Sequence, residues 1–127
     1  VLGILYESQK TDDMPKEQAA DFDQKAMDSY KKAIEVDPSF ARAQYDYGRK
    51  IADKAFTIND ESSNLSQSEY IQVRDNQIFP LFKEAAGYFE KAYELNPDEM
   101  NDALRYLRNL YYNLGDDANL KRVESLQ

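Results

Sequence analysis

Arginine and tyrosine side chains that could bind a carboxylate recur along one predicted helical face. Arg42, Tyr45 and Arg49 stand at positions i, i+3 and i+7, which places them on the same side of a helix. Arginine guanidinium groups bind carboxylates through two parallel hydrogen bonds. However, Asp46 and Asp53 follow the two arginines by four residues each, which is the spacing of ordinary surface ion pairs. The pattern predicts either a carboxylate-binding face or a solvated helix surface, and the sequence leaves both open.

The residue types that most enzymes use for catalysis are largely missing. The chain has no histidine and no cysteine, so the commonest general bases, nucleophiles and metal sites cannot be built. Carboxylates remain, but the sequence has no glycine-rich phosphate loop and no G-x-S-x-G motif. Asp12 and Asp13 suggest a metal, yet no further ligands follow at calcium-loop spacing, which favours a solvated loop. We expect a non-catalytic protein with no cofactor and no metal.

The composition indicates a single, soluble, acidic domain. A chain of 127 residues is long enough for one core, and its 10 Tyr and 6 Phe with only 4 Gly and 4 Pro favour packed helices over disorder. The net charge of −8 repels phosphate backbones and anionic membranes, so we expect no nucleic-acid partner. No apolar run approaches the roughly 20 residues that span a bilayer, so we expect no membrane insertion. Without cysteine, redox chemistry indicates no compartment.

The chain repeats one pattern of small, aromatic and proline residues. Segment 26–40, AMDSYKKAIEVDPSF, is largely written again at 85–99 as AAGYFEKAYELNPDE. Each copy puts alanines and an aromatic residue on one helical face and then reaches a proline, which pushes the preceding residue out of the α region. The repeat therefore predicts two helices with the same stop signal. Its positions are Ala26, Tyr30, Ala33 and Pro38 in the first copy and Ala85, Phe89, Ala92 and Pro97 in the second.

This pattern resembles the second helix of a tetratricopeptide repeat, whose period is roughly 34 residues. Segments similar to the first helix of that repeat stand at 2–6 (LGILY), 47–51 (YGRKI) and 107–111 (LRNLY). Gly3 and Gly48 are expected where the paired helix comes close, whereas Arg108 departs from the pattern and predicts looser packing of the third pair. Gly115 matches the family's turn between helices and is expected just past a helix end with positive φ.

The resemblance implies an all-α fold, a right-handed α-α superhelix like that of bacterial-type members of the family with a long inserted helical extension. The first motif begins part-way, as in a fragment lacking N-terminal residues, and a terminal helix at 118–126 is expected to cover the last hairpin. Two insertions lengthen the repeat, near 9–19 and near 55–79. The single domain would consist of three helical hairpins, at about 1–37, 39–96 and 99–126, the second one extended.

The longer insertion is expected to form two helical arms and a tip. The arms would protrude beyond the other hairpins by roughly 10 to 20 Å, at 1.5 Å per helical residue. Ser39 is expected to cap the first arm, and Ser66 with Glu69 forms a capping box that begins the second. Pro80 lies inside the second arm and is expected to kink it.

In solenoids of this family the first helices line the concave face, so the resemblance implies a scaffold for protein–protein interaction. A protein or peptide segment, unidentified by the sequence, would bind in that groove. The lysine and asparagine carboxylate clamp of the chaperone-binding members is not reproduced here, so their partner is not carried over. The expected groove residues are Arg42, Tyr45, Arg49, Arg105, Asn109 and Tyr112.

The alternative is an architectural role. The chain would then be one segment of a longer solenoid, or it would self-associate through the arms near residues 56–73. Apolar side chains left uncovered at the tip would drive that association. The residues concerned are Phe56, Ile58, Leu65, Tyr70, Ile71 and Val73.

Overall fold

The computed structural model describes residues 2–8 and 15–127, with the side chains of all of them except Leu2, Tyr6 and Ser8. Throughout these ranges the regular structure is helical, which confirms the predicted all-α class, and no helix in them is both long and apolar enough to cross a membrane. The loop of Asp12 and Asp13 lies outside the described residues. The elements are α1 (Leu2–Ser8), α2 (Lys16–Val36), α3 (Ala41–Glu61), α4 (Gln67–Val73), the π-helical segment η1 (Arg74–Ile78), α5 (Phe79–Leu95), α6 (Asp102–Leu114) and α7 (Asp117–Glu124).

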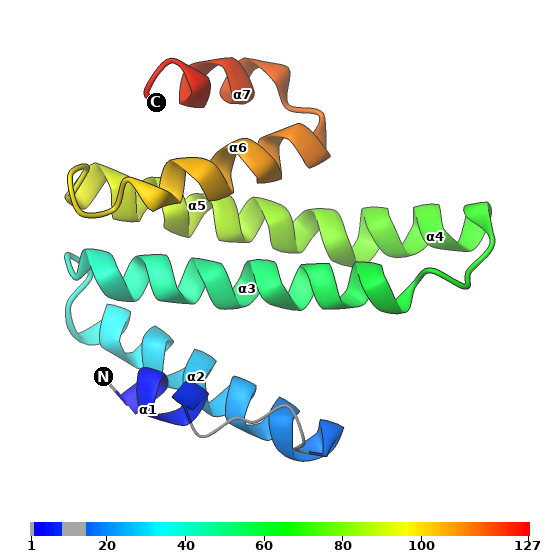
Figure 1. Cartoon of the computed structure of the whole chain (residues 1–127), viewed down its shortest axis with the longest axis horizontal. Helices are drawn as coiled ribbons and strands as arrows, with labels where there is room; N and C mark the ends of the chain where they lie inside the picture. The colour runs from blue at the N-terminus through cyan, green and yellow to red at the C-terminus, as the bar shows by residue number, and fades with distance from the viewer. Residues whose placement is uncertain (1, 9–14) are drawn as a thin grey trace.

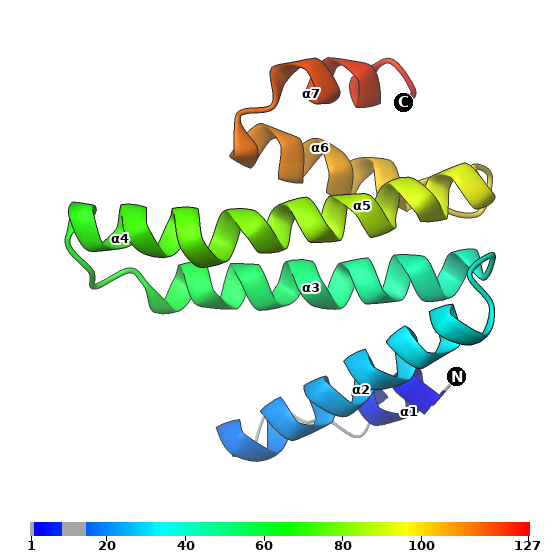
Figure 2. The ribbon, with the colours of Figure 1, turned by 180° about the vertical axis from the view of Figure 1, so that it is seen from behind.

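Consecutive helices pack side by side as antiparallel hairpins (Figure 1, with the reverse view in Figure 2). α1 packs on α2, α2 on α3, α3 on α5, α5 on α6 and α6 on α7, and the most extensive of these contacts joins α3 to α5. The hairpin of α3 with α4 and α5 is longer than its neighbours, and its closed end projects past α6 and α7 (Figure 1). This projection agrees with the arms that the second insertion predicts.

All the repeated alanine and aromatic residues except the half-buried Ala33 lie in the core. Ala26 and Tyr30 on α2, and Ala85, Phe89 and Ala92 on α5, are all completely buried. The small alanines let neighbouring helices approach, and the aromatic rings fill the space between them. The ring of Phe89 also stacks on a tyrosine of α6, with 4.7 Å between the ring centroids. Burying each such aromatic side chain stabilises the fold by about 2 kcal/mol.

Two glycines lie where paired helices come close together. A Cβ on Gly3 would lie 2.6 Å from the Tyr30 ring, and a Cβ on Gly48 would lie 3.2 Å from Tyr88 Cβ and 3.3 Å from a backbone carbonyl of α5. The close approach predicted at both glycines is confirmed. Gly87 in α5 is different, because no described atom of another element lies within 4 Å of the Cβ it would carry.

Hydrogen bonds of single side chains set the ends of the arms. Ser66 and Glu69 form the predicted capping box: Ser66 Oγ accepts from the Glu69 N–H at 3.2 Å, and the Glu69 carboxylate accepts from the Ser66 N–H at 3.4 Å. The prediction that Ser39 caps α3 is wrong. Its hydroxyl donates to Asp37 Oδ1 at 2.6 Å, and Phe40 occupies the N-cap position without a side-chain hydrogen bond.

The other predicted stop signals act where the sequence places them. α2 and α5 each end two residues before a proline that lies at an exposed turn: Val36 precedes Asp37 and Pro38, and Leu95 precedes Asn96 and Pro97. Gly115 follows α6 with a φ of 71°, which confirms the predicted left-handed helix end.

Pro80 is accommodated by a change in the hydrogen-bond pattern that precedes it. Between α4 and α5 the chain makes the π-helical turn η1, in which the Phe79 N–H donates to the Arg74 carbonyl five residues back. Proline has no N–H to donate, and its ring crowds the carbonyl four residues before it in an α-helix. A wider π turn at this point relieves that crowding. The hydrogen-bond pattern thus changes next to the position where the kink is predicted, and α4, η1 and α5 follow one another without a break (Figure 1). The kink itself stays a prediction.

The two arms bury much of their apolar surface against each other. Phe56 packs on Phe82 with 5.3 Å between the ring centroids, and Tyr70 OH donates to Asn59 Oδ1 at 2.6 Å across the arms. Phe56, Ile58, Tyr70 and Val73 are therefore only half-exposed, whereas Leu65 and Ile71 keep 39 % and 37 % of their surface in solvent. The uncovered apolar surface expected at the tip is smaller than the sequence suggests.

Candidate functional site

The six predicted groove residues form two groups, one on α3 and one on α6. In the α3 group, Tyr45 is buried with 8 % of its surface exposed, because its ring meets Phe89 at 5.6 Å and Tyr106 at 5.9 Å, both edge-on. The predicted outward position of Tyr45 is therefore wrong. This tyrosine belongs to the packing between α3, α5 and α6, and burial raises the pKa of its phenol.

Arg42 lies at the outer edge of the same contact. Its guanidinium stands 5.3 Å from the centre of the Tyr45 ring, and its Nε donates to Asp46 Oδ2 at 3.3 Å, while 54 % of the side chain stays exposed. The Asp46 side chain is only 1 % exposed, so this is not a solvated surface pair. A carboxylate that has lost its water needs close cationic partners to keep its charge. Arg42 therefore has a structural role, and its exposed edge is what remains for a ligand.

Arg49 is neutralised by carboxylates of its own chain. Its Nη2 donates to Glu7 Oε2 at 3.0 Å and to Asp46 Oδ1 at 3.5 Å. Glu7 also accepts from Tyr30 OH at 2.7 Å and pairs with Lys50 Nζ at 3.2 Å. Burial alone would raise the pKa of Glu7, but the hydrogen bonds from Arg49 and Tyr30 and the nearby cations outweigh it and hold this pKa below its ordinary value. Arg49 was expected to bind the carboxylate of a partner, but Glu7 of the same chain already supplies that carboxylate.

These contacts belong to a run of alternating charges across α1, α2 and α3, which we call the ion-pair chain. Its last link joins Lys50 Nζ to Asp23 Oδ1 at 2.8 Å. Sequence reasoning missed Glu7, because Glu7 and Arg49 are 42 residues apart and no helical spacing connects them. In order, the ion-pair chain consists of Arg42, Asp46, Arg49, Glu7, Lys50 and Asp23.

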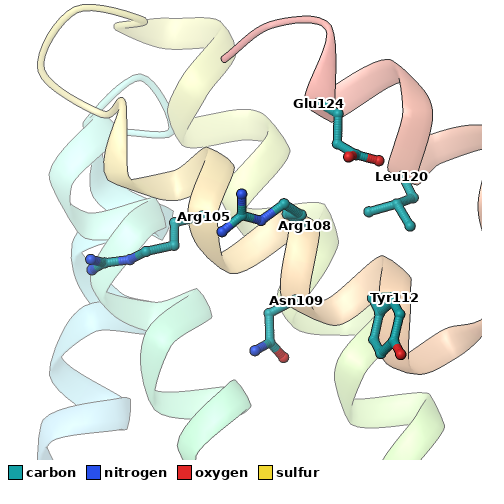
Figure 3. A pocket seen from close by; sticks show the side chains of 6 residues that line it. All are labelled: Arg105, Arg108, Asn109, Tyr112, Leu120 and Glu124. Carbon is teal, nitrogen blue, oxygen red and sulfur yellow. The ribbon is translucent and has the colours of Figure 1, made fainter.

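The α6 group borders a hollow between α6 and α7, which we call the α6–α7 hollow (Figure 3). Its volume is about 490 Å³. Leu120 and Glu124 line it from α7, and in Figure 3 Arg105 extends from α6 in the direction away from these two side chains. The side chains that α6 contributes are Arg105, Arg108, Asn109 and Tyr112.

Arg108 is one of the side chains that line the hollow from α6. In the alignment of 2–6 with 107–111 it takes the place of Gly3, which lets α1 touch the Tyr30 ring. Arg108 is exposed, and its Nη1 donates to Gln127 Oε1 at 3.4 Å. Arg108 therefore takes part in no close helix contact like that of Gly3, and the looser packing of the third pair stays a prediction.

The α6–α7 hollow presents hydrogen-bond donors to solvent. Among the described residues, no carboxylate lies within ion-pair distance of Arg105, and Tyr112 has 74 % of its surface exposed. Asn109 Oδ1 accepts from Asn113 Nδ2 at 2.8 Å, which leaves the amide N–H groups of Asn109 to donate elsewhere. Guanidinium, amide and phenol donors beside the apolar side chain of Leu120 suit a carboxylate that neighbours an apolar group.

The side chains that line the hollow include few groups that could catalyse a reaction. Glu124 is the one carboxylate among the described side chains that line the hollow, so the hollow holds no pair of acids. Across residues 2–8 and 15–127, no three acidic side chains come close enough together to hold a metal ion. Comparison with known proteins adds no assignment, because no model of a known protein family and no curated protein matches the chain. The hydrogen-bond donors that line the hollow are therefore the features that indicate a function.

Proposed function

We propose that the protein is a non-catalytic interaction module that binds an acidic segment of a partner protein on the exposed face of α6. The observation that carries the proposal is Arg105: it has no carboxylate partner among the described residues, whereas Arg49 and Lys50 on α3 are each paired twice. A chain of net charge −8 repels acidic ligands at long range, so attraction must come from a local group of donors. The α6–α7 hollow supplies such a group.

The same proposal includes a tetratricopeptide-like fold, a right-handed superhelix of three hairpins with the second one extended. Its support is the repeated pattern of Ala26 to Pro38 and Ala85 to Pro97, together with the antiparallel hairpins and the close contacts at Gly3 and Gly48. In that family the first helices, here α1, α3 and α6, line the concave face. A partner segment lying along α6 would then also pass the exposed edge of Arg42 on α3.

The expected ligand combines a carboxylate with an apolar side chain. Arg105 and Arg108 can donate to the carboxylate through their forked guanidinium groups. Leu120 and the exposed ring of Tyr112 offer apolar surface beside it. Arginine and tyrosine are the residue types that most often dominate binding energy at interfaces, because both bring large contact area with few rotatable bonds to fix.

The test is direct binding of a defined probe, a fluorescein-labelled hexapeptide of sequence Glu-Glu-Leu-Glu-Glu-Leu, which we call the acidic probe. We expect fluorescence anisotropy to show binding that weakens with salt, and the double variant Arg105→Ala, Arg108→Ala to lose at least about tenfold in affinity. The matched control is Lys31→Ala, Lys32→Ala on α2, which removes the same charge from exposed positions away from the hollow. Equal losses in both variants would show general electrostatics rather than a site, and the proposal would be wrong.

A second candidate function is self-association through the arms, favoured by the partial exposure of Leu65 and Ile71 near the tip. Sedimentation at several protein concentrations distinguishes the two functions, because only association through the arms requires the isolated chain to form larger species. If it does, Leu65→Asp with Ile71→Asp should restore the monomer without affecting the acidic probe.

A further inference from the structure

Asp53 on α3 is a carboxylate whose expected partners are engaged elsewhere. It follows Arg49 by four residues and Lys50 by three, which are the spacings of ion pairs on a helix. However, each of these two cations pairs twice with other carboxylates of the ion-pair chain. Among the described residues, no cation lies within ion-pair distance of Asp53 and no side chain donates a hydrogen bond to it. Asp53 is therefore left over when α1, α2 and α3 pair their charges.

The ion-pair chain is electrically balanced without Asp53. Its members are three cations, Arg42, Arg49 and Lys50, and three carboxylates, Glu7, Asp23 and Asp46. Asp53 adds a fourth carboxylate to this part of the molecule. Lys54 follows it directly, but neighbouring side chains on a helix do not face each other, and Lys54 is exposed and forms no ion pair within the described ranges. The negative charge of Asp53 therefore has no cation of its own.

The surroundings of Asp53 favour the arrival of a cation. Burial raises the pKa of the Asp53 carboxyl, and the nearby carboxylates of Glu7 and Asp23 add to this effect, while Lys50 and Arg49 oppose it without cancelling it. The side chain nevertheless remains accessible to solvent, so a ligand can reach it. A carboxylate that has lost part of its water and has no close partner gains more from an incoming cation than a fully hydrated one does.

Asp53 lines a hollow between α2 and α3, which we call the α2–α3 hollow. The two helices are joined by a short turn and diverge from it along their lengths (Figure 1 and Figure 2). The volume of the hollow is about 310 Å³. Ala20 and Met27 from α2 and Ile58 from α3 give it apolar surface beside the carboxylate. A ligand that fits this lining combines a positive charge with an apolar stem.

Oxygen acceptors from both helices accompany Asp53 in the lining of the hollow. Thr57 follows Asp53 by about one helical turn and brings a hydroxyl oxygen. Gln24 comes from α2, and its Nε2 donates to Asp28 Oδ1 at 2.9 Å, which leaves its carbonyl oxygen to accept. Acceptors on three separate side chains suit the three N–H donors of an ammonium group better than the planar fork of a guanidinium.

We propose that the α2–α3 hollow is a binding site for a primary ammonium group on an apolar stem, with Asp53 as its ion-pair partner. The stem would lie against Met27 and Ile58. Two sources carry this chemistry, namely the lysine side chain of a partner protein and a free alkylamine. The site is separate from the α6–α7 hollow, which α6 and α7 line, so the inference goes beyond the proposed function.

Two lysines line the same hollow and affect the binding of a cation differently. Lys50 Nζ lies 2.8 Å from Asp23 Oδ1 and 3.2 Å from Glu7 Oε1, so its charge is already neutralised. Lys54 carries an exposed charge that repels a cationic ligand, although solvent and salt weaken this repulsion. Substitutions at adjacent positions should therefore act in opposite directions: loss of the charge at Asp53 weakens binding, and loss of the charge at Lys54 strengthens it.

The experiment titrates the full chain with butylamine at neutral pH, where the amine is protonated, and follows the backbone amides by proton–nitrogen NMR. We expect the amide signals of the residues that line the α2–α3 hollow to shift, and Asp53→Asn to lose about threefold to fivefold in affinity. Lys54→Met should gain about twofold. The matched control is Asp60→Asn, which removes the same charge from an exposed position about two helical turns further along α3.

Three results would overturn the inference. The first is an equal affinity of the Asp53→Asn and Asp60→Asn variants for butylamine. The second is binding of butanol as tight as that of butylamine, because butanol has the apolar stem without the charge. The third is an unchanged or lower affinity of Lys54→Met, which keeps the test decisive even where Asp53→Asn does not fold.

A second probe distinguishes the two sources of the ammonium group. The peptide acetyl-Ala-Ala-Lys-Ala-Ala-amide presents the same group on a polypeptide. Tighter binding of this peptide than of butylamine would assign the site to a lysine of a partner protein, and weaker binding would assign it to a free amine; no binding of either would overturn the inference. The acidic probe reports on the α6–α7 hollow, so either proposal can fail while the other stands.

Discussion

Replacement of Gly48 by leucine tests the contact on which the fold most depends. Gly48 faces α5 across the most extensive helix contact of the molecule, and a Cβ there would lie 3.2 Å from Tyr88 Cβ and 3.3 Å from the Ala85 carbonyl oxygen. Both neighbours are parts of α5 that cannot rotate away, because one is a Cβ and the other is main chain. A leucine side chain must therefore push α3 and α5 apart.

Two opposing effects set the size of the change. Forcing extra atoms into a packed contact typically costs about 1–3 kcal/mol, and the upper part of this range applies where the neighbours are rigid. Leucine also has a better helix propensity than glycine, by about 0.8 kcal/mol, which offsets part of that cost. We expect Gly48→Leu to lower the free energy of unfolding by about 1–2 kcal/mol.

Urea denaturation followed by circular dichroism measures this change, and a second helical glycine supplies the control. Gly87→Ala meets no described atom of another element within 4 Å, so it should gain about 1 kcal/mol from helix propensity alone. We expect the midpoints to rank Gly87→Ala above the natural chain and Gly48→Leu below it. A Gly48→Leu midpoint equal to or above that of the natural chain would show that the close approach of α3 and α5 does not require glycine.

Two further predictions concern local contacts. Burial and the carboxylate of Glu90 raise the pKa of Tyr111 from 10 to about 12, so the folded state keeps a proton that the unfolded state loses. This contact stabilises the folded state fully below pH 10, and its contribution decreases toward pH 12. Between about pH 9 and about pH 11.5, the free energy of unfolding should therefore fall less for Tyr111→Phe than for the natural chain, as measured by urea denaturation. Ser66→Ala removes the capping box with Glu69 and should cost about 1 kcal/mol, whereas Ser68→Ala, on the exposed first turn of α4, should cost much less; equal effects would contradict the capping role.

Features that depend on a few neighbouring residues could be predicted from the sequence. The capping box at Ser66, the helix stops before Pro38 and Pro97 and the positive φ at Gly115 all follow from hydrogen bonds or steric limits within one turn of the chain. Ser39 is the instructive exception. Its hydroxyl donates to the Asp37 carboxylate and makes no capping hydrogen bond with the N-terminus of α3.

The candidate site shows the opposite case. Helical spacing correctly put Arg42, Tyr45 and Arg49 near one another, but spacing does not say which side of the helix faces solvent. Tyr45 turned out to lie in the core, because α5 and α6 each bring an aromatic ring to it. The charge of Arg49 is satisfied by Glu7, which reaches it from α1.

By itself, the sequence determined the helical class, most of the helix ends and the repeated small and aromatic core, because each of these depends on local dihedral preferences and on periodic burial. Only the tertiary structure decided which arginines are available to a ligand. A guanidinium is neutralised by whichever carboxylate comes within hydrogen-bond distance, and that depends on how α1 packs across α2 and α3 rather than on spacing along the chain. Arg49 and Arg105 look alike in the sequence, but among the described residues Arg49 pairs with two carboxylates and Arg105 with none.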